Sequence, residues 1–353
     1  TRGDGKKSYT MMAVEKKIRI HIKNNRWREG SFPNTPEGEK VFAITKERFH
    51  EALVKFPNLK DRIESFIDWD ENNFKTSMAT TDILLTWNLP TANLVKIAPK
   101  LKWIHCIGAG VEHLLPIDWL PNDVILTNNK GVHANKSGEY GLMSVLMLHN
   151  HLPTIVNNQQ IKKYEQLYGT PISGSTIVIV GTGSLGGAAA RLLESLGPKI
   201  IGVNRRGSFV KGFSEIVTVD KLDSVLPQAD ILYLALPATP ETHGLIDRRR
   251  LNLLKHSCGI VNVGRQSALD YHALSEMLKA GKLAGAILDV FTPEPIASSS
   301  PLWSVPNLII TPHVSSDDPE SYIPLTLKLF LSNLERFLSG KPLLNLVNKD
   351  LGY

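Results

Sequence analysis

The chain has 353 residues, 42% of them hydrophobic, and its 40 basic and 34 acidic residues give a net charge of +6. This length exceeds what one compact core needs and predicts two domains. The two cysteines, Cys106 and Cys258, lack paired metal-ligand spacing, so we expect no disulfide framework, no metal and a reducing, cytoplasmic compartment.

The patterns of charge and hydropathy exclude several classes of protein. No apolar run approaches eighteen residues, so no membrane span is expected. The basic residues are scattered among the acidic ones, which argues against a nucleic-acid surface and fits the attraction of small anionic substrates. The densest cluster, Arg248 to Arg250 after Asp247, is typical of the solvated first turn of a helix. Residues 1–13 lack the apolar core of a secretory signal and are expected to form a disordered tail.

Short apolar runs alternate with helical or loop-like segments in the first part of the chain. The runs IRIHI, VFAIT, DILLTW and KWIHCIG predict strands of a small α/β domain over residues 14–137. Near Gly138 the pattern changes to a long helix, GEYGLMSVLMLHNHL, which Pro153 ends or kinks. We expect this helix to connect the two domains.

Beyond Gly174 six β-branched runs alternate with helices: TIVIV, KIIGV, ILYLAL, GIVNV, GAILDV and LIITPH. They predict a doubly wound parallel sheet over residues 138–314. The helical segment SYIPLTLKLFLSNLERFLSG is expected to pack back onto the first domain, which then comprises residues 14–137 and 315–353. The predicted fold class is α/β, with two Rossmann-like domains and a first domain that is discontinuous in sequence.

A glycine-rich turn, GTGSLG, joins the strand TIVIV to the helix SLGGAAARLLESL. Its G-x-G-x-x-G pattern places Gly181 at a tight turn, Gly183 where backbone approaches a pyrophosphate, and Gly186 where helix and strand pack closely. Alone the string can be an ordinary turn, but its place between a strand and a helix indicates dinucleotide binding. The expected cofactor contacts in this turn are Gly181, Thr182, Gly183, Ser184, Leu185 and Gly186.

The end of the next strand predicts which dinucleotide binds. An NAD-preferring fold usually presents Asp or Glu to the ribose there, whereas this chain has Asn204, Arg205 and Arg206. Guanidinium groups bond the extra phosphate of NADP, which a carboxylate repels. We therefore predict a preference for NADP(H), with NAD(H) as an alternative because Asn204 can still bond a ribose hydroxyl. The alternative interpretation is that Arg205 and Arg206 bind no phosphate and are only solvated loop residues.

Three later segments each bring one reactive side chain to the ligand edge of the sheet: Arg265, Glu294 and His313. Arginine can hold a carboxylate and polarise a carbonyl through its planar fork. Histidine can donate a proton near neutral pH, and an adjacent carboxylate orients its ring. Each residue alone has an ordinary structural explanation, but together after a dinucleotide turn they predict reduction of a carbonyl.

These segments carry a resemblance to a known family. The stretch VNVGRQSALDYHALSEMLKAGKLAGAILDVFTPEP, followed by PLWSVPNLIITPH, resembles the D-isomer-specific 2-hydroxyacid dehydrogenases. Further matches are LKWIHCIGAGVEHL, TNNKGVHANKSGEYG and LPATPETHGLI, so the likeness covers nearly the whole chain. Within the family, PLW, TPHVSS and the terminal KDLGY are most similar to the glyoxylate/hydroxypyruvate reductase A type.

The resemblance implies roles for individual residues. Arg265 binds substrate and polarises its carbonyl, and His313, paired with Glu294, is acid in reduction or base in oxidation. The implied cofactor contacts are Leu236, Pro237, Thr242, Val263, Gly264 and Asp289. Asp289 is expected to contact the nicotinamide carboxamide; the alternative is that it only caps a turn. The implied substrate contacts are Arg265, the backbone amides of Ile107, Gly108, Ala109 and Gly110, and the side chains of Trp87 and Trp303 as pocket walls. Alternatively, residues 107–110 form an ordinary strand-ending turn, and the two tryptophans only pack in the core.

The resemblance further implies NADPH-dependent reduction of glyoxylate or hydroxypyruvate to a D-2-hydroxy acid by a homodimer joined through its cofactor domains. A bulkier 2-oxo acid substrate and a dinucleotide-sensing, corepressor-like binding protein are the alternatives. Two departures bear on substrate choice: Gln266 where the family commonly has glycine, and the side chains of His133 and Lys136 at the domain crossing.

Overall fold

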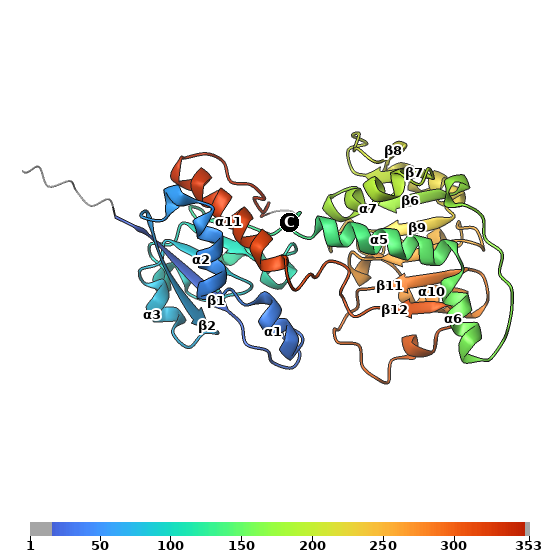
Figure 1. Ribbon diagram of the computed structural model, residues 1–353, viewed down its shortest axis with the longest axis horizontal. Helices are drawn as coiled ribbons and strands as arrows, with labels where there is room; N and C mark the ends of the chain where they lie inside the picture. Colours follow the sequence, from blue (N-terminus) through green and yellow to red (C-terminus); the bar gives the residue numbers. More distant parts are fainter. Residues whose placement is uncertain (1–15, 350–353) are drawn as a thin grey trace, which may run out of the picture.

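The computed structural model describes residues 16–349, so the expected tail and the last residues of KDLGY lie outside the described part of the chain. Two α/β domains, each built on its own parallel sheet, are joined by two connecting segments (Figure 1). Between residues 16 and 349, no helix combines the length and the apolar character needed to cross a bilayer.

The first sheet has five parallel strands in the order β2-β1-β3-β4-β5, which is the flavodoxin-like order. Consecutive residues of a strand face opposite sides, and β3 illustrates this: Ile83 and Leu85 pack with α2 and α11, whereas Leu84 packs with α3 and α4. The elements are β1 (Ile18–Asn24), α1 (Pro36–Phe42), α2 (Lys46–Val54), β2 (Ile63–Trp69), α3 (Phe74–Met78), β3 (Ile83–Thr86), α4 (Leu94–Ile97), β4 (Trp103–Cys106), β5 (Ile125–Thr127) and α11 (Tyr322–Leu338).

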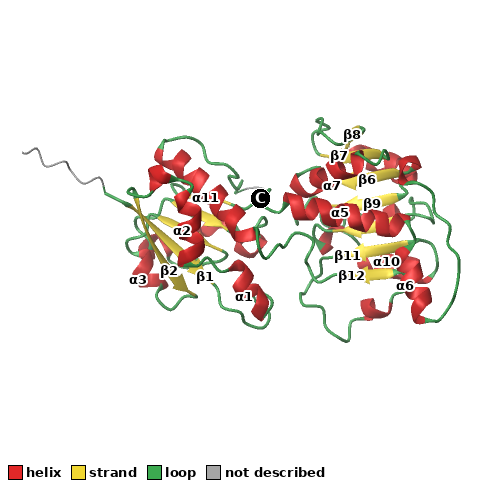
Figure 2. Ribbon diagram, in the orientation of Figure 1, coloured by secondary structure: helices red, strands yellow, loops and turns green. Residues whose placement is uncertain are grey.

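The second sheet has seven parallel strands in the order β12-β11-β10-β9-β6-β7-β8, the doubly wound order of a Rossmann fold. Helices α5 and α7 cover one face and α8, α9 and α10 cover the other, so the strands lie between helical layers (Figure 2). The elements are α5 (Ala134–His149), α6 (Leu152–Gln160), β6 (Thr176–Val180), α7 (Ser184–Glu194), β7 (Lys199–Asn204), β8 (Glu215–Thr218), α8 (Leu222–Val225), β9 (Ile231–Leu234), α9 (Arg248–Leu251), β10 (Gly259–Asn262), α10 (Tyr271–Lys279), β11 (Gly285–Leu288) and β12 (Leu308–Ile310).

The chain crosses between the domains twice, once between β5 and α5 and once between β12 and α11 (Figure 1). Because α11 packs on the first sheet, the first domain is discontinuous in sequence, as expected. Helix α5 begins at Ala134 and packs against α7 and the second sheet, so the first crossing precedes the expected boundary at residue 138 by a few residues.

Several local predictions were wrong. VFAIT is not a strand: Val41 and Phe42 form the last turn of α1, whose first turn has Pro36 and a Thr35 side chain that accepts a hydrogen bond from the Gly38 amide. Helix α5 ends at His149, and Pro153 lies in the first turn of α6 rather than ending α5. Strands β2, β5 and β8 were not foreseen. The cluster Arg248 to Arg250 does form the first turn of α9, with Asp247 as its N-cap, as predicted.

Candidate active site

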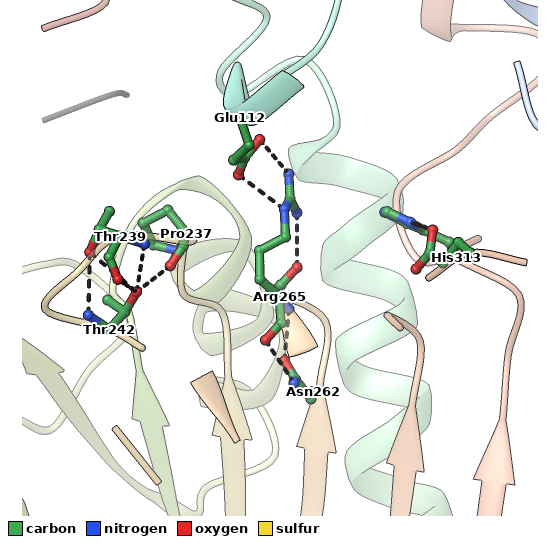
Figure 3. A network of polar contacts seen from close by, with 9 residues as sticks. Glu112, Pro237, Thr239, Thr242, Asn262, Arg265 and His313 are labelled. Carbon is green, nitrogen blue, oxygen red and sulfur yellow. Dashed lines mark hydrogen bonds and ion pairs between the residues drawn. The ribbon is translucent and has the colours of Figure 1, made fainter. Parts of the chain in front are cut away.

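The three expected catalytic side chains follow neighbouring strands of the second sheet. Arg265 comes after β10, Glu294 after β11 and His313 after β12, and these strands pair in parallel in that order. Their carboxyl ends therefore meet at one edge of the sheet. Figure 3 shows Arg265 and His313 above these strand ends, with Arg265 reaching toward the first domain.

His313 and Glu294 form a close pair. Nδ1 of His313 lies 2.7 Å from one carboxylate oxygen of Glu294, and the other oxygen accepts a hydrogen bond of 2.7 Å from the Phe291 amide. Burial lowers the pKa of His313, but the hydrogen bond and charge of Glu294 outweigh this effect and raise that pKa above 6.5. Burial likewise raises the pKa of Glu294, and His313 reverses this so that the pKa falls below its ordinary value.

Arg265 is oriented by its own turn and by the opposite domain. Asn262 fixes the turn because its Nδ2 donates to the Arg265 carbonyl and its Oδ1 accepts from the Gly264 amide, both at 3.1 Å. The guanidinium donates through Nη1 to the Gly264 carbonyl at 2.8 Å. Its Nε and Nη2 face the two carboxylate oxygens of Glu112, at 3.0 and 3.3 Å, across the gap between domains (Figure 3).

The loop after β4 was expected to hold a substrate carboxylate through its amides. The Ile107 amide is not free for this because it donates to the Thr86 carbonyl within the sheet, at 2.9 Å. Among residues 16–349, the amides of Ala109 and Gly110 donate to no protein acceptor. A Cβ on Gly110 would collide with Glu112 and Arg265, so this loop lies directly beside the guanidinium.

Two buried polar groups hold this loop in place. The Ile107 carbonyl accepts hydrogen bonds from Asn129 Nδ2 at 2.6 Å and from the Tyr322 hydroxyl at 2.7 Å. Asn129 precedes α5 and Tyr322 begins α11, so both crossing segments contribute. The position of the loop therefore depends on both connections between the domains.

Trp87 and Trp303 were both expected to form walls of the substrate pocket, but only Trp87 lies beside the loop after β4. Trp87 is half-buried between the rings of Phe32 and His113, at centroid distances of 4.1 and 4.0 Å, and a Cβ on Gly108 would collide with it. Trp87 therefore borders the loop. Trp303 is 55% exposed and donates to the Ala297 carbonyl. No hydrogen bond or ring contact joins it to Arg265 or His313 in the described chain.

The glycine-rich turn has the geometry of an anion site. Gly181 has φ of 98°, and a Cβ there would collide with the Ala235 carbonyl; a Cβ on Gly186 would collide with the Gly181 carbonyl. A Cβ on Gly183, by contrast, meets nothing within 4 Å. The first intrahelical bond of α7 is donated by Gly187, so the amides of Ser184, Leu185 and Gly186 are left without helical acceptors. These amides and the open space beside Gly183 fit a pyrophosphate.

The residues expected to bind the adenosine ribose lie at the end of β7. Asn204 bonds Thr182 through Nδ2, at 3.0 Å, and its Oδ1 accepts from the Arg206 and Gly207 amides. Asn204 thus organises the turn that carries Arg205 and Arg206, and both arginines are exposed there. Hydrogen bonds from its own backbone and from Thr239 lower the pKa of Glu241 in the loop after β9, and the charge of Arg205 lowers that pKa by a smaller amount.

The remaining expected cofactor residues lie along neighbouring strand ends. Thr242 donates to the Pro237 carbonyl at 2.6 Å, which closes the loop after β9 (Figure 3). A Cβ on Gly264 would collide with the Leu236 backbone, so the ends of β9 and β10 approach closely, and the Val263 side chain is buried.

Asp289 is fully buried and holds the segment around His313. Its carboxylate accepts from Thr311 Oγ1 and from the Val314 and Ser315 amides, at 2.6 to 3.0 Å. This arrangement matches the turn-capping alternative for Asp289.

Other polar residues of the site were missed or left without a role. Glu112 was not singled out, because a single acid after a loop gives no signal of a partner 153 residues away.

Gln266 accepts a hydrogen bond of 2.5 Å from the Thr292 amide and so stabilises the loop before Glu294. His133 is buried, and its ring lies 4.6 Å from the Tyr322 ring at a tilt of 53°. Burial lowers the pKa of His133 to about 4, although a hydrogen bond with the Ser316 backbone acts in the opposite direction. Burial raises the pKa of Asp317, near His313, to about 6.

Comparison with known proteins gives a consistent result. Residues 142–315 match the family described as D-isomer specific 2-hydroxyacid dehydrogenase, NAD binding domain. The chain is 30% identical to the glyoxylate reductase of Thermofilum pendens over 268 residues, which cover 74% of this chain and 78% of that protein.

Solved structures agree with this result. The NADPH-dependent glyoxylate/hydroxypyruvate reductase of Sinorhizobium meliloti, in complex with NADP and sulfate, is 26% identical, with a TM-score of 0.77 over 96% of this chain and 100% of that one. A D-isomer specific 2-hydroxyacid dehydrogenase from Xanthobacter autotrophicus, in complex with NADPH and MES, is also 26% identical with a TM-score of 0.77, over 96% of this chain and 99% of that one.

The two-domain fold and the family match together define an NAD(P)-dependent oxidoreductase whose second domain matches a dinucleotide-binding domain. The chain belongs to the D-isomer specific 2-hydroxyacid dehydrogenase family.

Proposed function

We propose that the chain is an NADPH-preferring reductase of small 2-oxo acids, with glyoxylate and hydroxypyruvate as the leading substrates and a D-2-hydroxy acid as the product wherever that product is chiral. The observation that carries this proposal is the pair of His313 and Glu294 at 2.7 Å on the same sheet edge as Arg265. A pure dinucleotide sensor does not need this arrangement, which is why we favour catalysis over binding alone.

Each side chain has a defined task in this reaction. The glycine-rich turn would hold the pyrophosphate of the dinucleotide, whose dihydronicotinamide would supply a hydride to the carbonyl carbon. Arg265 holds the substrate carboxylate and stabilises charge that develops on the carbonyl oxygen. His313 carries the proton on Nε2, since Nδ1 faces Glu294, and gives it to that oxygen. Closure of the two domains over the substrate excludes water.

The cofactor preference rests on the turn after β7. Arg205 and Arg206 are exposed at the point where an adenosine ribose phosphate is expected, and two structural neighbours were solved with NADP or NADPH. Charge-assisted hydrogen bonds from guanidinium groups favour the doubly charged phosphate over a hydroxyl. NAD(H) remains an alternative cofactor. A homodimer joined through the dinucleotide-binding domains stays a prediction from the family resemblance.

A steady-state assay tests the proposal. Oxidation of NADPH and NADH is followed with glyoxylate, hydroxypyruvate, pyruvate and phenylpyruvate, and cofactor binding is measured separately by fluorescence titration. Rapid turnover with NADPH and one of the two small substrates is the expected result. Turnover confined to phenylpyruvate would move the substrate class to bulkier acids, and tight cofactor binding without turnover of any acid would contradict the enzymatic function.

A further inference from the structure

The ion pair between Glu112 and Arg265 joins the two domains at the site itself. Glu112 begins the short 3-10 helix Glu112–Leu114 of the first domain, two residues after Gly110, and Arg265 follows β10 of the second. The two side chains are 29% and 34% exposed, so the pair is partly shielded from water. Burial raises the pKa of Glu112, but the charge of Arg265 overcomes this, so the carboxylate stays ionised.

The geometry is that of a carboxylate in the side fork of a guanidinium. Oε1 lies 3.0 Å from Nε and Oε2 lies 3.3 Å from Nη2, which places one oxygen on each of two adjacent donors. The Nη1 donor is engaged by the Gly264 carbonyl at 2.8 Å. Another carboxylate can therefore take the side fork only if Glu112 leaves it.

The same spot is where the proposed function places the substrate. A Cβ on Gly110 would collide with both the Glu112 carboxylate and Arg265 Nη2, so the ion pair lies against the loop whose Ala109 and Gly110 amides have no acceptor in the described part of the chain. The carboxylate of a 2-oxo acid held by these amides and by Arg265 would overlap the carboxylate of Glu112.

We propose that Glu112 is an internal competitor of the substrate carboxylate for the Arg265 fork, so that a 2-oxo acid binds by replacing one carboxylate with another. This inference rests on the proposed function. The exchange keeps Arg265 paired in both states and breaks a contact between the domains as the substrate enters. Glu112 therefore sets the affinity for 2-oxo acids without taking part in the chemistry.

The test is the variant Glu112→Gln in the full chain. Three quantities are compared with the wild type: kcat and KM for glyoxylate, the Kd of oxamate measured by calorimetry on the protein loaded with NADP, and the Kd of NADPH. Removing a partly exposed carboxylate that competes for the fork should lower the KM and the oxamate Kd about threefold to tenfold. The kcat and the NADPH Kd should stay within about twofold.

A matched control removes a carboxylate from the same part of the first domain. Asp118 is exposed on the next 3-10 helix, Ile117–Trp119, and Asp118→Asn should leave all these quantities unchanged. Glu112→Asp is the second variant, because a shorter carboxylate keeps the charge but reaches the fork less well. It should lower the KM by a smaller factor than Glu112→Gln, and it preserves the test if the glutamine variant fails to fold.

Two results would overturn the inference. A lower kcat with a higher KM in both Glu112 variants would mean that Glu112 positions Arg265 for catalysis. Unchanged KM and oxamate affinity would mean that the substrate binds elsewhere on the guanidinium while Glu112 stays in place. Failure of the proposed function is distinguishable, because then the wild type itself neither turns over a 2-oxo acid nor binds oxamate.

Discussion

His313 Nδ1 lies 2.7 Å from Glu294 Oε2, on two loops that follow the neighbouring strands β12 and β11. The backbone at His313 has φ of 53°, a left-handed conformation, and because Nδ1 faces Glu294 the proposed mechanism assigns the substrate oxygen to Nε2. The carboxylate thus fixes both the orientation of the ring and the affinity of the ring for its proton.

The first prediction concerns the pH dependence of reduction in Glu294→Gln. In the proposed mechanism reduction needs protonated His313, and Glu294 raises the His313 pKa above 6.5, so wild-type kcat should fall as pH rises through that raised value. Without the carboxylate, burial lowers the pKa, so the falling limb should move to lower pH. At neutral pH kcat should drop about tenfold or more. The kcat is measured against pH for both proteins.

A control for this experiment is Glu320→Gln, because Glu320 is an exposed acid on the segment between β12 and α11 that also carries His313. Its profile should match the wild type. If the limb of Glu294→Gln stays where the wild type has it, the limb does not report on His313 and the assignment of the proton donor is wrong.

The second prediction separates two glycines of one turn. A Cβ on Gly186 would collide with the Gly181 carbonyl, so Gly186→Ala should lower both the Tm and the NADPH affinity. Within residues 16–349, a Cβ on Gly183 meets no atom within 4 Å beyond its immediate chain neighbours, so Gly183→Ala should fold with nearly wild-type Tm. It should bind NADPH about tenfold or more weakly, because the methyl group fills the space for the pyrophosphate. Thermal unfolding and fluorescence titration measure the two effects. Wild-type NADPH affinity in Gly183→Ala would contradict the phosphate site.

The third prediction concerns the exposed arginines after β7. Replacing Arg205 and Arg206 together by alanine should raise the KM for NADPH about tenfold or more and change the KM for NADH little, because only NADPH carries the extra phosphate. The double variant Lys55→Ala, Lys60→Ala removes the same charge from exposed positions of the other domain and serves as control. Equal increases for both cofactors would refute phosphate recognition by these arginines.

The fourth prediction tests how α11 supports the loop after β4, residues 107–110. The Tyr322 hydroxyl donates one of the two hydrogen bonds that hold the Ile107 carbonyl. Tyr322→Phe should lower the free energy of unfolding by about 0.5–1.5 kcal/mol and raise the KM for glyoxylate, with an unchanged Kd for NADPH. Chemical denaturation and steady-state kinetics measure this. Tyr168→Phe, at an 83% exposed position, is the control and should change neither quantity. A wild-type KM in Tyr322→Phe would show that the loop does not depend on this bond.

Much of the fold was predictable because its strands are buried on both faces. TIVIV is a continuous β-branched run and GIVNV holds three β-branched residues, as parallel strands covered on both sides favour, and both strands were located correctly. The edge strands β2 and β8, IESFIDW and EIVT, mix polar with apolar residues because they are partly exposed, and β5 has only three residues. Such strands give no apolar run to detect.

The candidate site was predictable where a residue follows a recognisable strand. Arg265, Glu294 and His313 each do so, and the structure places them on one sheet edge. Glu112 escaped notice because its importance depends on how the two domains face each other. Ile107 was expected to offer its amide, but the register of β4 with β3 commits that amide to the Thr86 carbonyl. Contacts of this kind depend on tertiary structure, which local sequence patterns do not report.

The role of His313 as proton donor is tested most directly by the rate of hydroxypyruvate reduction by NADPH in His313→Asn, measured together with the Kd of NADPH. Asparagine tolerates the left-handed backbone at this position but cannot donate a titrating proton. We expect kcat to fall at least about a hundredfold while the NADPH Kd stays within about twofold. A variant that reduces hydroxypyruvate at close to the wild-type rate would contradict the assignment of His313 as the proton donor.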